Sequence, residues 1–151
     1  MKRAWIPVVA VCALAACTPA DTHPLSDRTW EIIAVYTDPD MPGDVPADAA
    51  GRAALTFGRN SLTARTACAP LQARASVAAD SVRLERVEVG SLDDACAGGS
   101  RRLHEQLTGL LVEGAEFDVR HIGETEGEPK EIMLTLRSDA INPPAIRAVT
   151  P

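Results

Sequence analysis

The sequence is poor in aromatic residues: two Trp, one Tyr and two Phe make up 3% of its 151 residues. Proteins that bind single-stranded nucleic acid stack the bases on aromatic side chains beside a basic groove. The chain is also short of positive charge, with 15 Lys and Arg against 21 Asp and Glu and a formal net charge of −6. Because an acidic chain repels nucleic acid, we expect no nucleic-acid partner.

The sequence lacks the common catalytic motifs. It contains no GxSxG, no HExxH and no CxxC, and it has only three histidines. These motifs place a nucleophile, a metal-bound water or a redox pair at a fixed spacing. We therefore expect a protein that is not an enzyme and that carries no cofactor or metal centre. The alternative is a hydrolase that uses His104 or His121 with a nearby carboxylate.

No apolar run is long enough to span a membrane, and the longest run has the features of a signal peptide. It extends over residues 4–16, directly after Lys2 and Arg3, whereas a membrane-spanning helix needs about 20 apolar residues. Small residues precede Cys17 in Leu14-Ala15-Ala16-Cys17, a pattern that resembles a lipoprotein cleavage and lipidation site. We interpret residues 1–16 as a lipoprotein signal peptide and Cys17 as the lipidated residue. The alternative is an ordinary small residue of a signal that is uncleaved or cut in the conventional way.

Lipidation at Cys17 predicts how the mature chain reaches its membrane. Two or more acyl chains, such as palmitate, anchor a protein stably without spanning the bilayer. Residues 17–28 contain Pro19 and Pro24 among small polar residues, which indicates a lipidated tether before a domain at 29–151. We expect an extracytoplasmic lipoprotein on the cell membrane or the outer membrane. Its partners would be the membrane, through Cys17, and an envelope protein.

The remaining cysteines predict a disulfide. Cys12 lies in the expected signal peptide and Cys17 takes the lipid, which leaves Cys68 and Cys96. Exported proteins usually join such a pair, and closing this loop would stabilise the fold by about 3 to 4 kcal/mol in the chain-entropy model. The alternative is a redox or metal-binding pair, but no histidine lies near either cysteine at ligand spacing.

The segment 37–51 is acidic and rich in proline. It contains four aspartates and three prolines: Asp38, Asp40, Asp44, Asp48, Pro39, Pro42 and Pro46. Clustered carboxylates suggest a calcium site, but Pro42 stands where an EF-hand loop carries its third ligand and the closing glutamate is missing. We interpret the segment as a solvated acidic loop, with a cation site as the alternative.

Alternating apolar residues predict strands, and one stretch has helical spacing. The expected strands are 29–36, 53–57, 62–66, 71–77, 81–89, 116–122 and 131–136, with 146–149 either a last strand or loosely ordered. Apolar residues change phase near Glu85 and Arg86, which indicates a β-bulge. Leu103, Leu107 and Leu110 share a helical stripe, which predicts an amphipathic helix at about 100–112 with His104 on its polar face.

These elements predict an α+β fold. Period-2 segments before and after a single helical segment favour a strongly twisted antiparallel sheet, open or closed as far as a half-barrel, with one amphipathic helix packed on it. Trp30, in the first strand, is expected to be a core residue because buried aromatics are the usual case. A small lipocalin-like barrel is the alternative, although the inward residues could equally fill its interior.

The order of elements resembles the META domain, or HslJ-like, family of bacterial envelope lipoproteins. The resemblance rests on Leu25 and Trp30 in the leading strand, on Ala54-Leu55-Thr56-Phe57 and on a return strand that ends at Cys68. It continues with Ala95-Cys96, a Leu103 and Leu107 helix, and closing strands that end in Leu134-Thr135-Leu136. Members usually carry Gly-Cys-Asn at the first cysteine, where this chain has Ala67-Cys68-Ala69.

The resemblance implies a compact domain of antiparallel strands and one helix, with roles in envelope stress or secretion and no catalytic residues to carry over. Together with the expected anchor, it favours a lipid-anchored, non-enzymatic binding or envelope-stress module. The alternatives are a lipocalin-like carrier of an apolar ligand and a hydrolase.

Overall fold

The computed structural model describes residues 23–123 and 130–151. In chain order the elements are β1 (Thr29–Tyr36), η1 (Ala47–Ala49), β2 (Ala53–Phe57), β3 (Ser61–Thr66), β4 (Pro70–Val77), β5 (Ser81–Val89), α1 (Gly98–Leu110), β6 (Glu116–Ile122), β7 (Glu131–Leu136) and β8 (Ala145–Val149). Here η1 is a single 3₁₀ turn. The expected strands are therefore confirmed, and the tail forms the last of them.

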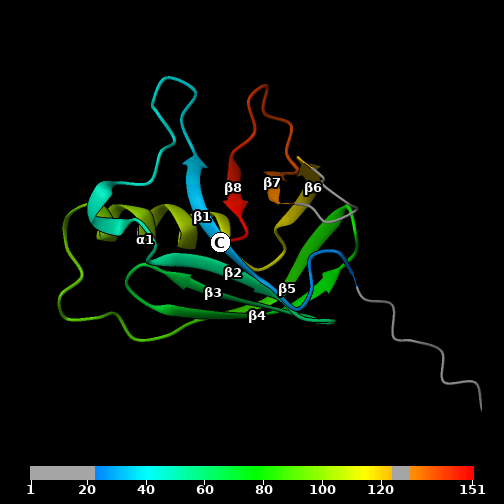
Figure 1. Ribbon diagram of the computed structural model, residues 1–151, viewed down its shortest axis with the longest axis horizontal. Helices are drawn as coiled ribbons and strands as arrows, with labels where there is room; N and C mark the ends of the chain where they lie inside the picture. Colours follow the sequence, from blue (N-terminus) through cyan, green and yellow to red (C-terminus); the bar gives the residue numbers. More distant parts are fainter. Residues whose placement is uncertain (1–22, 124–129) are drawn as a thin grey trace, which may run out of the picture.

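The strands form a closed barrel in which each pairs with its sequence neighbours and β8 returns to β1 (Figure 1). All pairs are antiparallel, and β8 pairs with β7 and β1, placing Ala148 opposite both Ile132 and Ile32. The predicted α+β fold with an open or half-closed sheet is therefore wrong, since the fold is a closed, mostly β barrel with one helix. The physical reason is that the short strand β8 supplies the last hydrogen-bonded edge, so that no edge is left unpaired. The lipocalin-like alternative gives the correct architecture.

The interior of the barrel is filled with side chains. An eight-stranded barrel is just wide enough for its inward residues to occupy the space. The inward residues that are essentially fully buried are Trp30, Ile32, Leu55, Phe57, Leu62, Leu71, Leu84, Phe117, Ile132, Leu134 and Ile146. Trp30 is a core residue, as predicted, and its Nε1 donates to the carbonyl oxygen of Leu25 at 3.0 Å. Leu25 is itself buried.

Helix α1 packs against η1, β1 and β3 (Figure 1). Its buried residues Leu103, Leu107 and Leu110 belong to the same core as the barrel interior, as the helical spacing predicts. The helix begins two residues earlier than expected, and Ser91-Leu92-Asp93-Asp94, which resembles a helix start, lies outside it. His104 is buried on the packed side of the helix, so its expected place on the polar face is wrong.

The predicted bulge is confirmed at Glu85. On β4 the consecutive residues Arg74 and Ala75 lie opposite Arg86 and Leu84 of β5, which leaves Glu85 as the extra residue. Val82 and Leu84 before the bulge are buried. After it, Val87 packs against the core, whereas Val89 is 47% exposed. The bulge therefore reverses which residues of β5 face outward.

Candidate functional site

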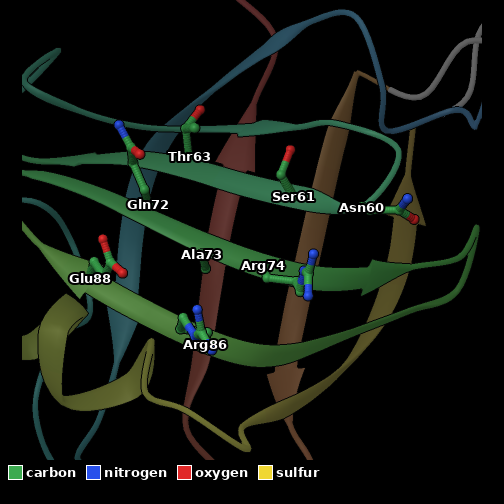
Figure 2. A pocket seen from close by; sticks show the side chains of 8 residues that line it. All are labelled: Asn60, Ser61, Thr63, Gln72, Ala73, Arg74, Arg86 and Glu88. Atoms are coloured by element: carbon green, nitrogen blue, oxygen red, sulfur yellow. The ribbon is translucent and has the colours of Figure 1, made fainter.

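A polar hollow of about 490 Å³ lies on the outer face of β3, β4 and β5. We call it the outer hollow. It is lined by Asn60, Ser61, Thr63, Gln72, Ala73, Arg74, Arg86 and Glu88, and Figure 2 shows these side chains on three neighbouring strands and at the end of the β2–β3 hairpin.

The register of the strands arranges the lining residues in two rows. Ser61 lies opposite Arg74, and Arg74 lies opposite Arg86. In the second row Thr63 lies opposite Gln72, and Gln72 lies opposite Glu88. Side chains directly opposite one another on one face have Cβ atoms about 4.5 to 5.5 Å apart. Each row can therefore contact a single small ligand.

The bulge at Glu85 places Arg86 in this hollow. In β5, Val82 and Leu84 face the core, so a regular alternation would turn Arg86 inward as well. The extra residue reverses the phase, and Arg86 and Glu88 face outward. Bulges commonly re-aim a side chain next to a functional site. The same irregularity that sequence alternation reveals thus builds the row of Arg74 and Arg86.

Apart from Ala73, the lining side chains are polar. Within residues 23–123 and 130–151 none of these polar side chains makes a hydrogen bond or an ion pair. The neighbouring exposed residues do: Ser76 Oγ donates to Glu85 Oε1 at 2.8 Å. On the other strands of the barrel, Arg137 pairs with Glu116 and Asp118 of β6, and Arg147 of β8 pairs with Glu131 of β7. Arg74 and Arg86 face each other without a paired carboxylate. The outer hollow is therefore rich in unused donors.

The ion pairs of Arg137 and Arg147 shift the pKa values of the groups that form them. The hydrogen bond from Arg137 lowers the pKa of the Asp118 carboxyl below its ordinary value, and the same contact raises the pKa of Arg137. Hydrogen bonds to Glu131 and then to Tyr36 raise the pKa of Arg147. Arg137 and Arg147 thus form ion pairs within the protein.

A second hollow of about 490 Å³ lies beside the disulfide. It is lined by Gly51, Arg52, Arg65, Ala67, Cys68, Ala69, Pro70, Ser91, Leu92 and Asp93. The structure joins Cys68 to Cys96 with their Cα atoms 5.3 Å apart, as predicted. The amide of Asp93 donates to the Cys68 carbonyl at 2.8 Å. The disulfide thus fixes the segment that precedes α1 to the turn after β3.

The two histidines of the hydrolase hypothesis lie in different places. His104 Nδ1 is 2.7 Å from Thr66 Oγ1, and both residues are buried. Thr66 Oγ1 also donates to the carbonyl oxygen of Ala69 at 2.8 Å, which makes this pair a link between α1 and the disulfide turn. His121 Nε2 lies 2.7 Å from the carbonyl oxygen of Ala79. The structure brings neither histidine into the outer hollow.

The acidic segment 37–51 contacts the first turn of helix α1 through Asp48, which the sequence did not indicate. Asp48 Oδ2 accepts the backbone N–H of Ser100 at 3.1 Å, in the first turn of α1. Ser100 Oγ donates to the Asp48 carbonyl at 3.2 Å, and Arg52 Nη1 donates to Ser100 Oγ at 3.1 Å. Within the described ranges no group of three or more His, Cys, Asp or Glu side chains is placed to hold a metal ion.

The remaining predicted site residue, Cys17, lies outside the described residues. Among the residues that the structure describes, no helix has the length and apolar character needed to cross a membrane. Sequence reasoning missed the outer hollow because its residues come from three strands and meet only through the register of the sheet.

Comparisons with known proteins inform on the fold. No family model matches the chain, and no curated protein matches it. An NMR structure of a protein from Burkholderia xenovorans has a TM-score of 0.57 and 13% identity, covering 97% of this chain and 99% of that one. A second protein, also solved by NMR, has a TM-score of 0.53 and 12% identity, with 85% of this chain and 95% of that chain covered. At these identities the likeness extends to the fold alone.

Proposed function

We propose that the protein is a lipid-anchored, extracytoplasmic binding module of the cell envelope that is not an enzyme, and that its ligand binds on the outside of the barrel. One observation carries the second part. The barrel interior is filled by buried side chains, whereas the outer hollow presents polar side chains without partners among the residues that the structure describes. A rigid scaffold with unused donors on one face suits recognition of a ligand.

The sequence around Cys17 supports the anchor. Basic residues, a short apolar run and small residues precede it, as in a lipoprotein signal. The disulfide between Cys68 and Cys96 agrees with an oxidising compartment, where such bonds persist. The resemblance to the META domain family adds an envelope role in stress or secretion to this proposal.

Fractionation of a bacterial host tests the anchor. We expect the wild-type chain in the membrane fraction, labelled by a radioactive fatty acid, and the Cys17→Ser variant unlabelled and outside that fraction. Cys12→Ser is the matched control and should behave like wild type, since Cys12 lies in the part expected to be removed. Unchanged labelling and membrane association of Cys17→Ser would contradict the proposal.

A carrier of an apolar ligand is the second candidate, favoured by the closed eight-stranded barrel. It requires an interior that opens, because Trp30, Phe57 and Phe117 are fully buried in the core. Native mass spectrometry of the unlipidated protein distinguishes the two functions. A stoichiometric lipid that stays bound in Arg86→Gln, a variant of the outer hollow, would favour the carrier. The mass of the bare chain would favour a ligand on the outer face.

A further inference from the structure

We infer that the outer hollow binds an oxyanion of the phosphate-ester type, held between Arg74 and Arg86. This inference rests on the proposed function, because it names the ligand of the surface proposed there.

The first argument is the electrostatic cost of the arginine pair. Arg74 and Arg86 lie directly opposite each other on neighbouring strands, and like charges at such positions destabilise a sheet. Arg137 and Arg147 differ, because each contacts acidic side chains on adjoining strands. An anion between Arg74 and Arg86 would turn the repulsion into two attractions.

The second argument is the chemistry of the donors. A guanidinium presents several N–H groups in a planar fork that matches the oxygens of a phosphate. The row that contains the two arginines also contains the hydroxyl of Ser61, and Thr63 and Asn60 line the same hollow. All these groups can donate to an oxyanion. The volume of about 490 Å³ exceeds that of a phosphate alone and leaves room for its substituent.

The third argument is local charge. The segment 58–90 carries five arginines, Arg59, Arg65, Arg74, Arg83 and Arg86, against Asp80, Glu85 and Glu88, while the chain as a whole is acidic. The outer hollow itself holds two arginines and one glutamate. A local excess of positive charge attracts a small anion even when the protein as a whole is negatively charged.

Glu88 limits which anions fit. It lies in the second row, opposite Gln72, and is two positions from Arg86 along β5. A polyanion that covered both rows would meet this carboxylate. The arrangement therefore favours a single phosphate group whose substituent is neutral or cationic, as in a soluble phosphate ester or the headgroup of a phospholipid.

The test is a titration of the full chain carrying Cys17→Ser, labelled with ¹⁵N, with inorganic phosphate followed by NMR. We expect saturable shifts of the amides of Ser61, Thr63, Arg74 and Arg86. Arg86→Gln should weaken binding roughly tenfold or more, since it removes a charge-assisted contact. Glu88→Gln should strengthen binding, because it removes a repelling carboxylate.

Arg83→Gln is the matched control. Arg83 is an outward residue of the same strand that lies opposite Ser76 and Glu116, outside the hollow. It removes the same charge and should change the affinity less than twofold. Equal losses of affinity in Arg83→Gln and Arg86→Gln would overturn the inference.

Two further probes separate the sources of the phosphate group. O-phosphoethanolamine represents a soluble ester, and vesicles of phosphatidylethanolamine and phosphatidylglycerol represent a lipid surface. If one of these two probes binds wild type and this binding is lost in Arg86→Gln, the inference is supported, and the probe that binds identifies the source of the phosphate group. Binding of neither phosphate nor any of these probes refutes the oxyanion site while the fractionation of Cys17→Ser still decides the anchor.

Discussion

Ala67 lies in the left-handed region of the backbone, with φ of +74°. A side chain at such a position costs about 1 to 2 kcal/mol, a cost that glycine avoids. Ala67 and Ala69 are the two positions at which the chain differs from the Gly-Cys-Asn pattern usual in the META domain family that its order of elements resembles. The turn that carries Cys68 therefore has an alanine at a position whose backbone conformation favours glycine.

We predict that Ala67→Gly raises the free energy of unfolding by about 1 kcal/mol, since relief of strain exceeds the added flexibility of the unfolded chain. Ala69→Gly, in the same turn but without a positive φ, should lower it by roughly 0.5 to 1 kcal/mol. Urea denaturation of the three proteins measures both effects. A lower stability of Ala67→Gly would contradict the account of this turn.

At the residue scale, the ion pair between Asp118 and Arg137 should make the stability of the protein depend on pH. Arg137 lowers the pKa of the Asp118 carboxyl in the folded protein. The contribution of this carboxylate to the free energy of unfolding is therefore present above its unfolded pKa of about 3.9, and it is lost as the pH falls through the lower folded pKa. We expect Asp118→Asn to be less stable than wild type at pH 7 and the difference to vanish at low pH.

Urea denaturation at a series of pH values from neutral to acidic measures this difference. Asp94→Asn, in the exposed loop before α1, removes the same charge at another exposed position and is the control for the substitution itself. A difference between Asp118→Asn and wild type that stays constant across the acidic range would show that the ion pair with Arg137 does not contribute.

At the scale of elements, α1 depends on a residue far away in the sequence. Its N-terminus has no side-chain cap from Ala97, and the carboxylate of Asp48, 52 residues before Ser100, accepts the Ser100 amide instead. A negative group at this position also interacts favourably with the helix dipole. Local capping signals at Ser91 to Asp94 therefore could not locate the start of the helix.

We predict that Asp48→Ala lowers the free energy of unfolding by about 1 kcal/mol, the usual cost of losing an N-terminal cap. Asp40→Ala, in the same acidic segment and exposed, should change it by less than about 0.5 kcal/mol. Thermal or urea denaturation compares the two variants. Equal losses would assign the effect to the charge of the segment rather than to the cap.

The elements themselves were largely predictable from the sequence. The alternation of apolar and polar residues located the strands, and its change of phase at Glu85 located the bulge. Both signals arise because apolar side chains are buried away from water. His104 was misplaced because its partner, Thr66, lies 38 residues away on β3. The outer hollow was missed for the same reason: Arg74 and Arg86 become neighbours only through the register of β4 and β5.

At the scale of the whole molecule, closure of the barrel could not be read from the sequence. It depends on Ala145–Val149, a five-residue strand, pairing with β1 at the other end of the chain. Patterns along the chain show which residues face inward but not whether the last strand meets the first. Because the closed barrel is filled, we propose that the ligand binds on its outer face.

The filled interior predicts a large cost for removing core volume. Leu134→Ala should lower the free energy of unfolding by about 2 to 5 kcal/mol, because it leaves a cavity among packed side chains. Ile141→Ala, at a side chain that is 98% exposed, is the control and should be nearly neutral. A small cost for Leu134→Ala would indicate a hollow barrel and favour the apolar carrier.

The central claim, an anchored and exported binding module, is tested most directly by the intact mass of the protein purified from its native membrane, with and without reduction. We predict the mass of residues 17–151 plus acyl chains, and a gain of two hydrogens when the bond between Cys68 and Cys96 is reduced. A mass that retains residues 1–16, or one that reduction leaves unchanged, would contradict the account.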